Sequence, residues 1–368
     1  MAWRPRYFTL WSGQAISYFG SSVVQFALVW WLTQESDGSA TVLAVATMSA
    51  LLPQIVLGPF AGVLVDRWSR GSIMVVADLV AGLVALLLVV LFVAGAIEIW
   101  HVYAAMALRS TVGAFQYSAM TASTSLMVPA AHLARISGLN QALGGVLGIT
   151  APPMGALLMS TLPMEGVLLF EVVTMLFGVV PLIFIAVPRP AKAPNTGRST
   201  TFFAEFAAGL NYVWRWPGMV TLLAMICAIN FVMMPPSALL PVLVAKHFDG
   251  NALHLASLQS TFGFGVLAGG LALVGWGLAA VMSAFTNGPL IAVLQTKTAP
   301  EMQGRLLSVV NSLASSMAPL SLAVAGPLAD AIGVRAVFAL SGTVCAVLGV
   351  AGFFMRPLSR FEDGAPAR

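Results

Sequence analysis

Three charged residues lie inside long apolar stretches of this 368-residue sequence: Asp78, Arg109 and Glu171. A charge within a bilayer costs roughly 2.5–3.5 kcal/mol on insertion scales unless it is paired or hydrated, so such residues are expected in ion pairs, substrate pathways or proton relays. Arg109 and Glu171 each stand about nine residues into an apolar segment. This places both side chains ~13 Å along a helix, near the middle of a membrane.

Arg109 and Glu171 allow three interpretations. Glu171 takes up and releases a proton under the control of Arg109, the two residues form a static ion pair, or Glu171 is protonated and faces lipid. Asp78 stands six residues into its own apolar segment, ~9 Å deep. We expect Asp78 to pair with Arg67 or Arg70 at the membrane boundary rather than to contact a substrate.

The composition indicates that membrane helices position these residues. Hydrophobic residues make up 59% of the chain and charged residues 8%, against about 25% charged residues in a soluble domain. The mean hydropathy is +0.93. These values exclude a soluble enzyme, a disordered chain and a disulfide-stapled secreted module. Cys227 and Cys345 lie in apolar runs without a CxxC pair and are predicted to be core residues.

The first half of the chain divides into six apolar segments, near residues 8–33, 40–65, 72–97, 100–128, 133–160 and 163–187. Residues 188–217 interrupt this pattern with arginines, prolines and a polar run, which is typical of an exposed linker. The sequence therefore predicts an N-terminal six-helix bundle over residues 1–187, a cytoplasmic linker over 188–217 and a shortened C-terminal bundle over 218–368.

The basic residues of the first half that lie outside the apolar segments fall on one side of the predicted membrane. They are Arg4, Arg6, Arg67, Arg70 and Arg135, whereas the opposite loops hold only the acidic residues Glu35, Asp37, Glu98 and Glu165. An excess of Lys and Arg marks the cytoplasmic side of membrane proteins. We therefore expect a cytoplasmic N-terminus. The formal net charge of +4 is attributed to this orientation signal and not to nucleic-acid binding.

The second half repeats the first but is shorter. Asp37 finds a counterpart in Asp249, and Asn140 finds one in Asn311, but the second pair is separated by about forty residues fewer than the first. About forty residues are therefore missing between Asp249 and Asn311. By length, Ala252–Gln295 makes two crossings, but the charges of the later loops favour one. We expect about eleven membrane-spanning segments.

The loop between the second and third segments reads Gly62-Val-Leu-Val-Asp66-Arg67-Trp-Ser-Arg70-Gly71. It resembles the signature loop of the major facilitator superfamily, with Ser69 and Gly71 in place of a glycine and a basic residue. The resemblance covers nearly the whole chain. It implies an all-α membrane fold of two pseudosymmetric helical bundles that rock about a central site.

The patterns Arg305-Leu-Leu-Ser-Val-Val-Asn311 and Ala325-Gly326-Pro327-Leu-Ala-Asp330 resemble the macrolide-efflux branch of drug:proton antiporters, which also includes siderophore exporters. That family has twelve helices, so the resemblance assigns the missing residues to helix nine and the start of helix ten. It also implies that Asp66 docks near Gly304–Leu307, at the start of helix eleven, and closes the cytoplasmic side as part of a gate with Gly62, Arg67 and Arg70.

Two further motifs are similar to those of the antiporters. Arg109 followed by Gly113 resembles the helix-four motif implicated in proton coupling. The run Ala151-Pro152-Pro153-Met-Gly155 resembles the glycine–proline motif of helix five, with Ala151 where glycine is usual. A proline-kinked packing helix is the alternative. Nearby Gly144, Gly145 and Gly148 are expected to allow close helix packing.

By resemblance, helices one, four, seven and ten line the substrate cavity. A mixture of sparse polar groups with soft apolar ones suits bulky amphipathic compounds. Each polar candidate is as readily explained by a hydrogen bond between helices. The candidates are Gln14, Ser17, Gln25, Tyr117, Asn230, Met233, Met234 and Asn287.

These observations predict a secondary transporter of the bacterial inner membrane that exports amphipathic, macrolide-like molecules, in exchange for protons. The sequence has no phosphate-binding loop, HExxH site or Gly-x-Ser-x-Gly elbow, so no enzymatic activity is expected. We expect no cofactor, metal or nucleic-acid partner, and a monomer in the lipid bilayer. A siderophore exporter and an inactive shortened or engineered relative without transport of its own are the alternatives.

Overall fold

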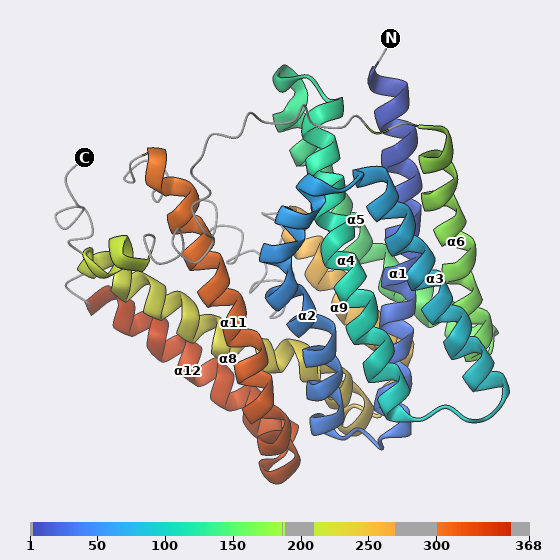
Figure 1. The fold of residues 1–368 in the computed structure, drawn as a ribbon. Coiled ribbons are helices and arrows are strands. Elements are labelled where there is room, and N and C mark those ends of the chain that lie inside the picture. The colour runs from blue at the N-terminus through green and yellow to red at the C-terminus, as the bar shows by residue number, and fades with distance from the viewer. Residues whose placement is uncertain (1–2, 186, 188–209, 269–299, 355–368) are drawn as a thin grey trace.

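The computed structural model describes residues 3–185, 187, 210–268 and 300–354, which form helices joined by short turns (Figure 1). Within these residues there is no β-strand. The helices are α1 (Trp3–Glu35), α2 (Ala40–Arg67), α3 (Arg70–Val93), α4 (Ile99–Met127), α5 (Ala130–Thr161), α6 (Met164–Phe184), α8 (Pro217–His247), α9 (Ala252–Ala268), α11 (Pro300–Ile332) and α12 (Val334–Phe354).

The all-α fold and the six segments of the first half are confirmed to within a few residues. Helix α1 begins earlier than predicted, at Trp3, and α3 ends earlier, at Val93, because Gly95 turns the chain with a φ of +63°. Eight of the described helices are long and apolar enough to cross a membrane. The predicted linker is described only from Leu210 onward.

The turns after α1 and α8 confirm the sequence repeat. Asp37 and Asp249 share a φ of +47°, a conformation that Asp and Asn adopt more readily than most residues. In each turn the next residue closes the helix, with Gly38 N donating to Thr33 O at 2.7 Å and Gly250 N donating to Val244 O at 2.9 Å.

Apolar clusters join the two halves of the chain at one end of the molecule. Three clusters that contain residues of both halves include Trp30 with Val244, Leu43 with Leu239, and Ala44 with Leu322. All lie where α1 ends, α2 begins and α11 ends, which we call the closed end. Around the start of α1 and the start of α8, the clusters of described residues belong to one half each.

The direction of the helices settles the number of net crossings after α8. The start of α9 packs at the closed end, with Leu255 and Ala256 in a shared cluster. Helix α11 starts at the other end, where Leu306 packs on Trp216. The chain therefore makes one net crossing between these two points, as the charge pattern predicts. The remainder of the doubtful stretch, residues 269–299, lies outside the described residues.

Candidate functional site

Arg109 and Glu171 form an ion pair inside the N-terminal bundle. The Arg109 guanidinium on α4 donates to Glu171 Oε2 on α6, and both side chains are buried. Helix α1 completes the group, because Ser21 Oγ donates to Glu171 Oε1 at 2.8 Å and Ser21 O accepts from Arg109 Nη2 at 3.1 Å. Pairing removes much of the cost of two charges at this depth.

The described partners of Asp78 are neutral side chains. Its Oδ1 accepts from Ser17 Oγ at 2.8 Å and from Gln116 Nε2 at 2.9 Å, and its Oδ2 accepts from Gln14 Nε2 at 2.8 Å. The pairing predicted with Arg67 or Arg70 is therefore not observed for the described Arg70. The reason is depth, because Asp78 lies two helical turns beyond the start of α3 at Arg70, ~12 Å along the helix.

One face of α1 connects the two acidic groups. Gln14, Ser17 and Ser21 recur at helical spacing, and the first two are almost completely buried. Gly178 on α6 leaves room for this arrangement, since a Cβ there would lie 2.9 Å from Asp78 Oδ2. The prediction that Gln14 and Ser17 line the substrate cavity is wrong, because both face the interior of their own bundle.

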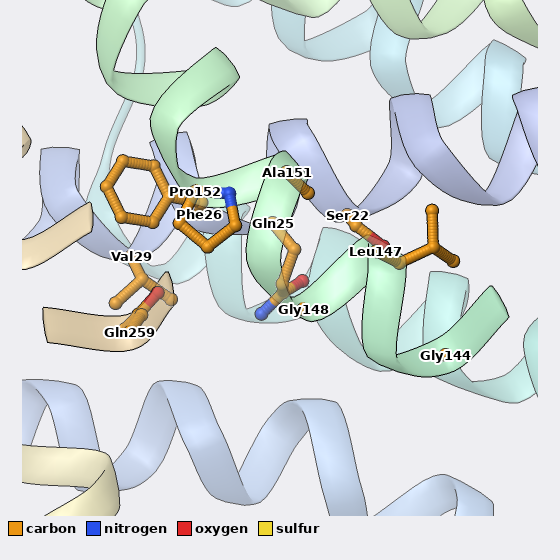
Figure 2. Close-up of a pocket in the computed structure, with 10 residues that line it drawn as sticks. All are labelled: Ser22, Gln25, Phe26, Val29, Gly144, Leu147, Gly148, Ala151, Pro152 and Gln259. Atoms are coloured by element: carbon orange, nitrogen blue, oxygen red, sulfur yellow. The ribbon is translucent and has the colours of Figure 1, made fainter. Parts of the chain in front are cut away.

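A cavity of about 440 Å³ lies between the bundles at α1, α5 and α9 (Figure 2). Its wall is largely apolar, and we call it the apolar lobe. Figure 2 shows Gln25 and Gln259 among the side chains around it. Gln25, a predicted cavity residue, thus lines this cavity. The described lining residues are Ser22, Gln25, Phe26, Val29, Gly144, Leu147, Gly148, Ala151, Pro152 and Gln259.

A second cavity of about 780 Å³ lies between α2, α8 and α11. Its polar lining residues define what we call the polar lobe: Gln54, Asn230, Asn311, Ser312, Ser315 and Ser316. The remaining lining residues are Leu51, Ile55, Val56, Phe60, Met234, Ala314 and Ala318. Asn230 and Met234 were predicted cavity residues, whereas Gln54 and the α11 face were missed although each is a polar interruption of an apolar segment.

The two lobes are related by the internal repeat. Ser22 and Gly144 of the apolar lobe correspond to Met234 and Ser315 of the second cavity, at the two offsets that the sequence repeat established. Helices α1, α5 and α9 thus correspond to α8, α11 and α2. The sequence analysis expected helices one, four, seven and ten to line a substrate cavity, whereas α2, α5, α9 and α11 contribute most of the walls of these two cavities, and Asn287 of the predicted helix ten lies outside the described residues.

Asp330 caps the start of α2 from the opposite bundle. Its carboxylate accepts from Ala40 N at 2.8 Å, Thr41 N at 2.9 Å and Ser39 Oγ at 3.2 Å. The first N–H groups of a helix have no partner within the helix, so a carboxylate stabilises them. Gly326 lets the helices approach, because a Cβ there would lie 2.7 Å from that of Ala44.

The described glycines of α5 differ in their roles. A Cβ on Gly155 would lie 2.7 Å from Phe26 Cδ1, so this residue permits close packing of α5 on α1. Gly144 and Gly148 have open space around them and line the apolar lobe instead. Pro152 and Pro153 lie within an uninterrupted helix, and Ala151 is buried.

The remaining candidates lie elsewhere. Tyr117 is 66% exposed and lines neither lobe, and Met233 on α8 is half-buried and also lines neither. Asn287 lies outside the described residues, as do the side chains of the gate residues Gly62, Asp66 and Arg67. Among the described residues, no group of three His, Cys, Asp or Glu side chains could hold a metal ion.

Comparison with known proteins shows which family and which relatives this chain resembles. A sequence model of the Major Facilitator Superfamily matches residues 10–278. Macrolide efflux protein A of Streptococcus pyogenes is 30% identical over 389 positions that cover 95% of each chain. Multidrug efflux pump Tap of Mycobacterium tuberculosis is 27% identical and covers 87% of this chain and 85% of its own.

The alignment with the streptococcal protein also bears on the length of the second half. The aligned part of this chain is shorter than the 389 aligned positions, and roughly forty positions have no residue here. This agrees with the shortfall found from the repeat. The place predicted for it, helix nine and the start of helix ten, lies outside the described residues.

Solved structures share the fold at low identity. A bacterial homologue of the human lysosomal transporter Spinster is 15% identical, with a TM-score of 0.63 over 98% of this chain and 92% of its own. A POT family transporter has a TM-score of 0.68 at 10% identity, over 95% of this chain and 96% of its own. These likenesses concern the fold alone.

Proposed function

Because this chain belongs to the Major Facilitator Superfamily, we propose that it exports amphipathic small molecules of the macrolide and multidrug kind by alternating access. As a member of that family it is a membrane transporter and not an enzyme. The observation that carries the proposal is the pair of cavities between the bundles, because both end at the apolar clusters of the closed end.

The orientation of the chain determines which side is closed. Arg4, Arg6 and Arg135 lie at the end away from the closed end, which supports a cytoplasmic location for that end. Lys246 and Arg335 lie at the closed end. Lys246 belongs to the last turn of α8, where its positive charge interacts favourably with the helix dipole. With this orientation the described conformation faces inward, and substrate enters from the cytoplasm of a bacterial cell.

Two buried acidic groups support coupling to protons. Glu171 is neutralised by Arg109, whereas Asp78 accepts from amide and hydroxyl donors. The shared face of α1 offers a polar route between the two carboxyl groups. A proton that binds at either carboxylate changes the hydrogen bonds of α1, and α1 also lines the apolar lobe. Proton binding and substrate binding thus act on one helix.

Everted membrane vesicles test this function directly. They are incubated with a macrolide or a fluorescent dye, and accumulation of the compound inside the vesicles is measured with and without an uncoupler. Uncoupler-sensitive accumulation is expected of the native chain. Accumulation that the uncoupler leaves unchanged would contradict proton coupling but not transport.

One observation favours a second candidate, an inactive relative. The chain lacks roughly forty residues that the streptococcal protein has. A version with forty residues of a full-length relative inserted after Trp276 separates the two candidates. Transport by the restored chain alone would identify the present protein as an inactive relative with the same fold.

A further inference from the structure

Three helices each bring one carboxamide to the polar lobe at a similar depth. Gln54 belongs to α2, which begins at Ala40, Asn230 to α8, which begins at Pro217, and Asn311 to α11, which begins at Pro300. These positions are ~17–21 Å along their helices. All three are therefore close to the middle of helices that run from end to end of the molecule.

The side chains of the polar lobe have unused hydrogen-bonding capacity. Asn230 Nδ2 donates to Ile226 O at 2.9 Å and Ser316 Oγ donates to Ser312 O at 2.7 Å, which leaves the Asn230 carbonyl oxygen available. Gln54, Asn311 and Ser315 are exposed to the cavity. Polar groups within the membrane need partners, so these side chains require water or a ligand.

The chemistry and size of this cavity select a class of ligand. Its described lining has no charged side chain, so it offers no counter-charge to an ionic group. Its volume of about 780 Å³ suits an organic ligand. The cavity is much larger than a metal-ion site, in which the oxygen ligands lie about 2.3–2.6 Å from the ion. Carboxamides and hydroxyls instead pair with neutral hydroxyl and carbonyl oxygens.

The apolar lobe has a different character although it is the repeat counterpart. Where α11 presents Ser315 and Ser312, α5 presents Gly144 and Gln141, and only the glycine lines the cavity. The wall around Phe26 and Leu147 is suited to an apolar ring system. Pseudosymmetry therefore supplies two cavities with mostly apolar walls that differ in the number of polar side chains, six in the polar lobe against three in the apolar lobe.

We propose that the polar lobe binds the neutral, oxygen-rich part of an amphipathic substrate, such as an uncharged sugar, while the apolar lobe holds its hydrophobic part. This inference rests on the proposed export of such molecules. Asn230 and Asn311 form hydrogen bonds to the sugar, and Gln54 adds a contact from the other bundle. The polar lobe therefore determines preference among related substrates.

Binding of two closely related probes to the full chain in detergent tests this assignment. Erythromycin and its derivative without the neutral cladinose sugar share the lactone ring and the amino sugar. Radioligand binding is measured for the native chain and for Asn230→Leu, Asn311→Leu and the smaller change Ser315→Ala. Gln259→Met in the apolar lobe is the matched control.

Each asparagine variant is expected to weaken erythromycin binding about fivefold, the effect of one neutral hydrogen bond, and the derivative less than twofold. The control is expected to affect both probes equally. Equal losses for both probes, no loss in any variant, or no binding of either probe to the native chain would overturn the assignment. If the asparagine variants lose the preference for erythromycin as expected but the native chain does not transport in vesicles, export is refuted and the assignment of the polar lobe stands.

Discussion

Asp330→Asn is expected to weaken the contact that holds the two bundles together at the closed end. The carboxylate accepts two backbone N–H groups of α2, from Ala40 and Thr41, and the Ser39 hydroxyl. An asparagine keeps one acceptor oxygen but places an NH2 group against the remaining donors. The substitution also removes a negative charge from a helix N-terminus.

The magnitude follows from these contacts. Loss of a helix cap costs about 0.5–2 kcal/mol, and loss of the charge at the helix terminus costs about 0.3–1 kcal/mol. Asp330 is exposed, so solvent screening keeps both contributions toward their lower ends. A total of about 1–2 kcal/mol changes the ratio of closed to separated molecules about 5–30-fold.

Pulsed electron paramagnetic resonance measures this ratio. Spin labels are attached at Gln34→Cys and Ala331→Cys, two exposed positions at the closed end, in a chain with Cys227→Ala and Cys345→Ala. The fraction of long distances is expected to rise in Asp330→Asn. Asp249→Asn is the control, because it makes the same charge change in a turn of left-handed backbone that asparagine tolerates.

Unchanged distances in Asp330→Asn would show that the apolar clusters alone close this end. An equal shift in Asp249→Asn would assign the effect to net charge at the surface. Either result would refute the proposed role of the cap.

Three further predictions test the interior of the N-terminal bundle. Arg109→Ala is expected to abolish transport without loss of expression, and normal export by this variant in everted vesicles would remove Arg109 from the coupling scheme. Asp78→Asn keeps the size of the side chain but cannot bind or release a proton, so substrate binding is expected to survive while uncoupler-sensitive transport is lost. Unchanged transport would assign Asp78 a structural role. Gly155→Val is expected to lower stability by about 1–3 kcal/mol through overpacking against Phe26, measured as a fall in Tm. Gly148→Ala should cause no fall in Tm, because its Cβ meets open space and alanine favours the helix.

The sequence was sufficient to predict the helices, because these depend on local features, and it gave an ion pair as one of three interpretations of Arg109 and Glu171. Apolar length set the spans, and the equal depths of Arg109 and Glu171 made their contact a natural expectation. Rotation about each helix axis was harder to predict. Gln14 and Ser17 were placed in the cavity, but packing of α1 on α6, and of α6 on α3, turns them toward Asp78.

The polar lobe was largely missed for a related reason. Its residues come from α2, α8 and α11, and the sequence analysis considered only some helices as cavity walls. Gln54 is a single polar residue within an apolar stretch, and Asn311 was noted only as part of a motif. Neither position reveals its neighbours until the two halves of the chain are brought together by their repeat.

Substrate binding in the polar lobe and contact between the bundles at the closed end both involve helices α2 and α11. The polar lobe lies directly beside the cluster of Ala44 and Leu322, since Leu51 and Met234 belong to both surroundings. Asp330 caps α2 beyond that cluster. In the internal repeat, Met159 of α5 corresponds to Asp330 of α11, and Met159 packs near Ala252 at the start of α9. An apolar side chain therefore takes the place of the carboxylate at the repeat-related contact. A ligand that joins Gln54 of one bundle to Asn311 of the other therefore changes the free energy of the same helix pair that the cap holds. Since a ligand shifts a conformational equilibrium only through its differential affinity for the two states, substrates that reach both residues should influence closure most strongly.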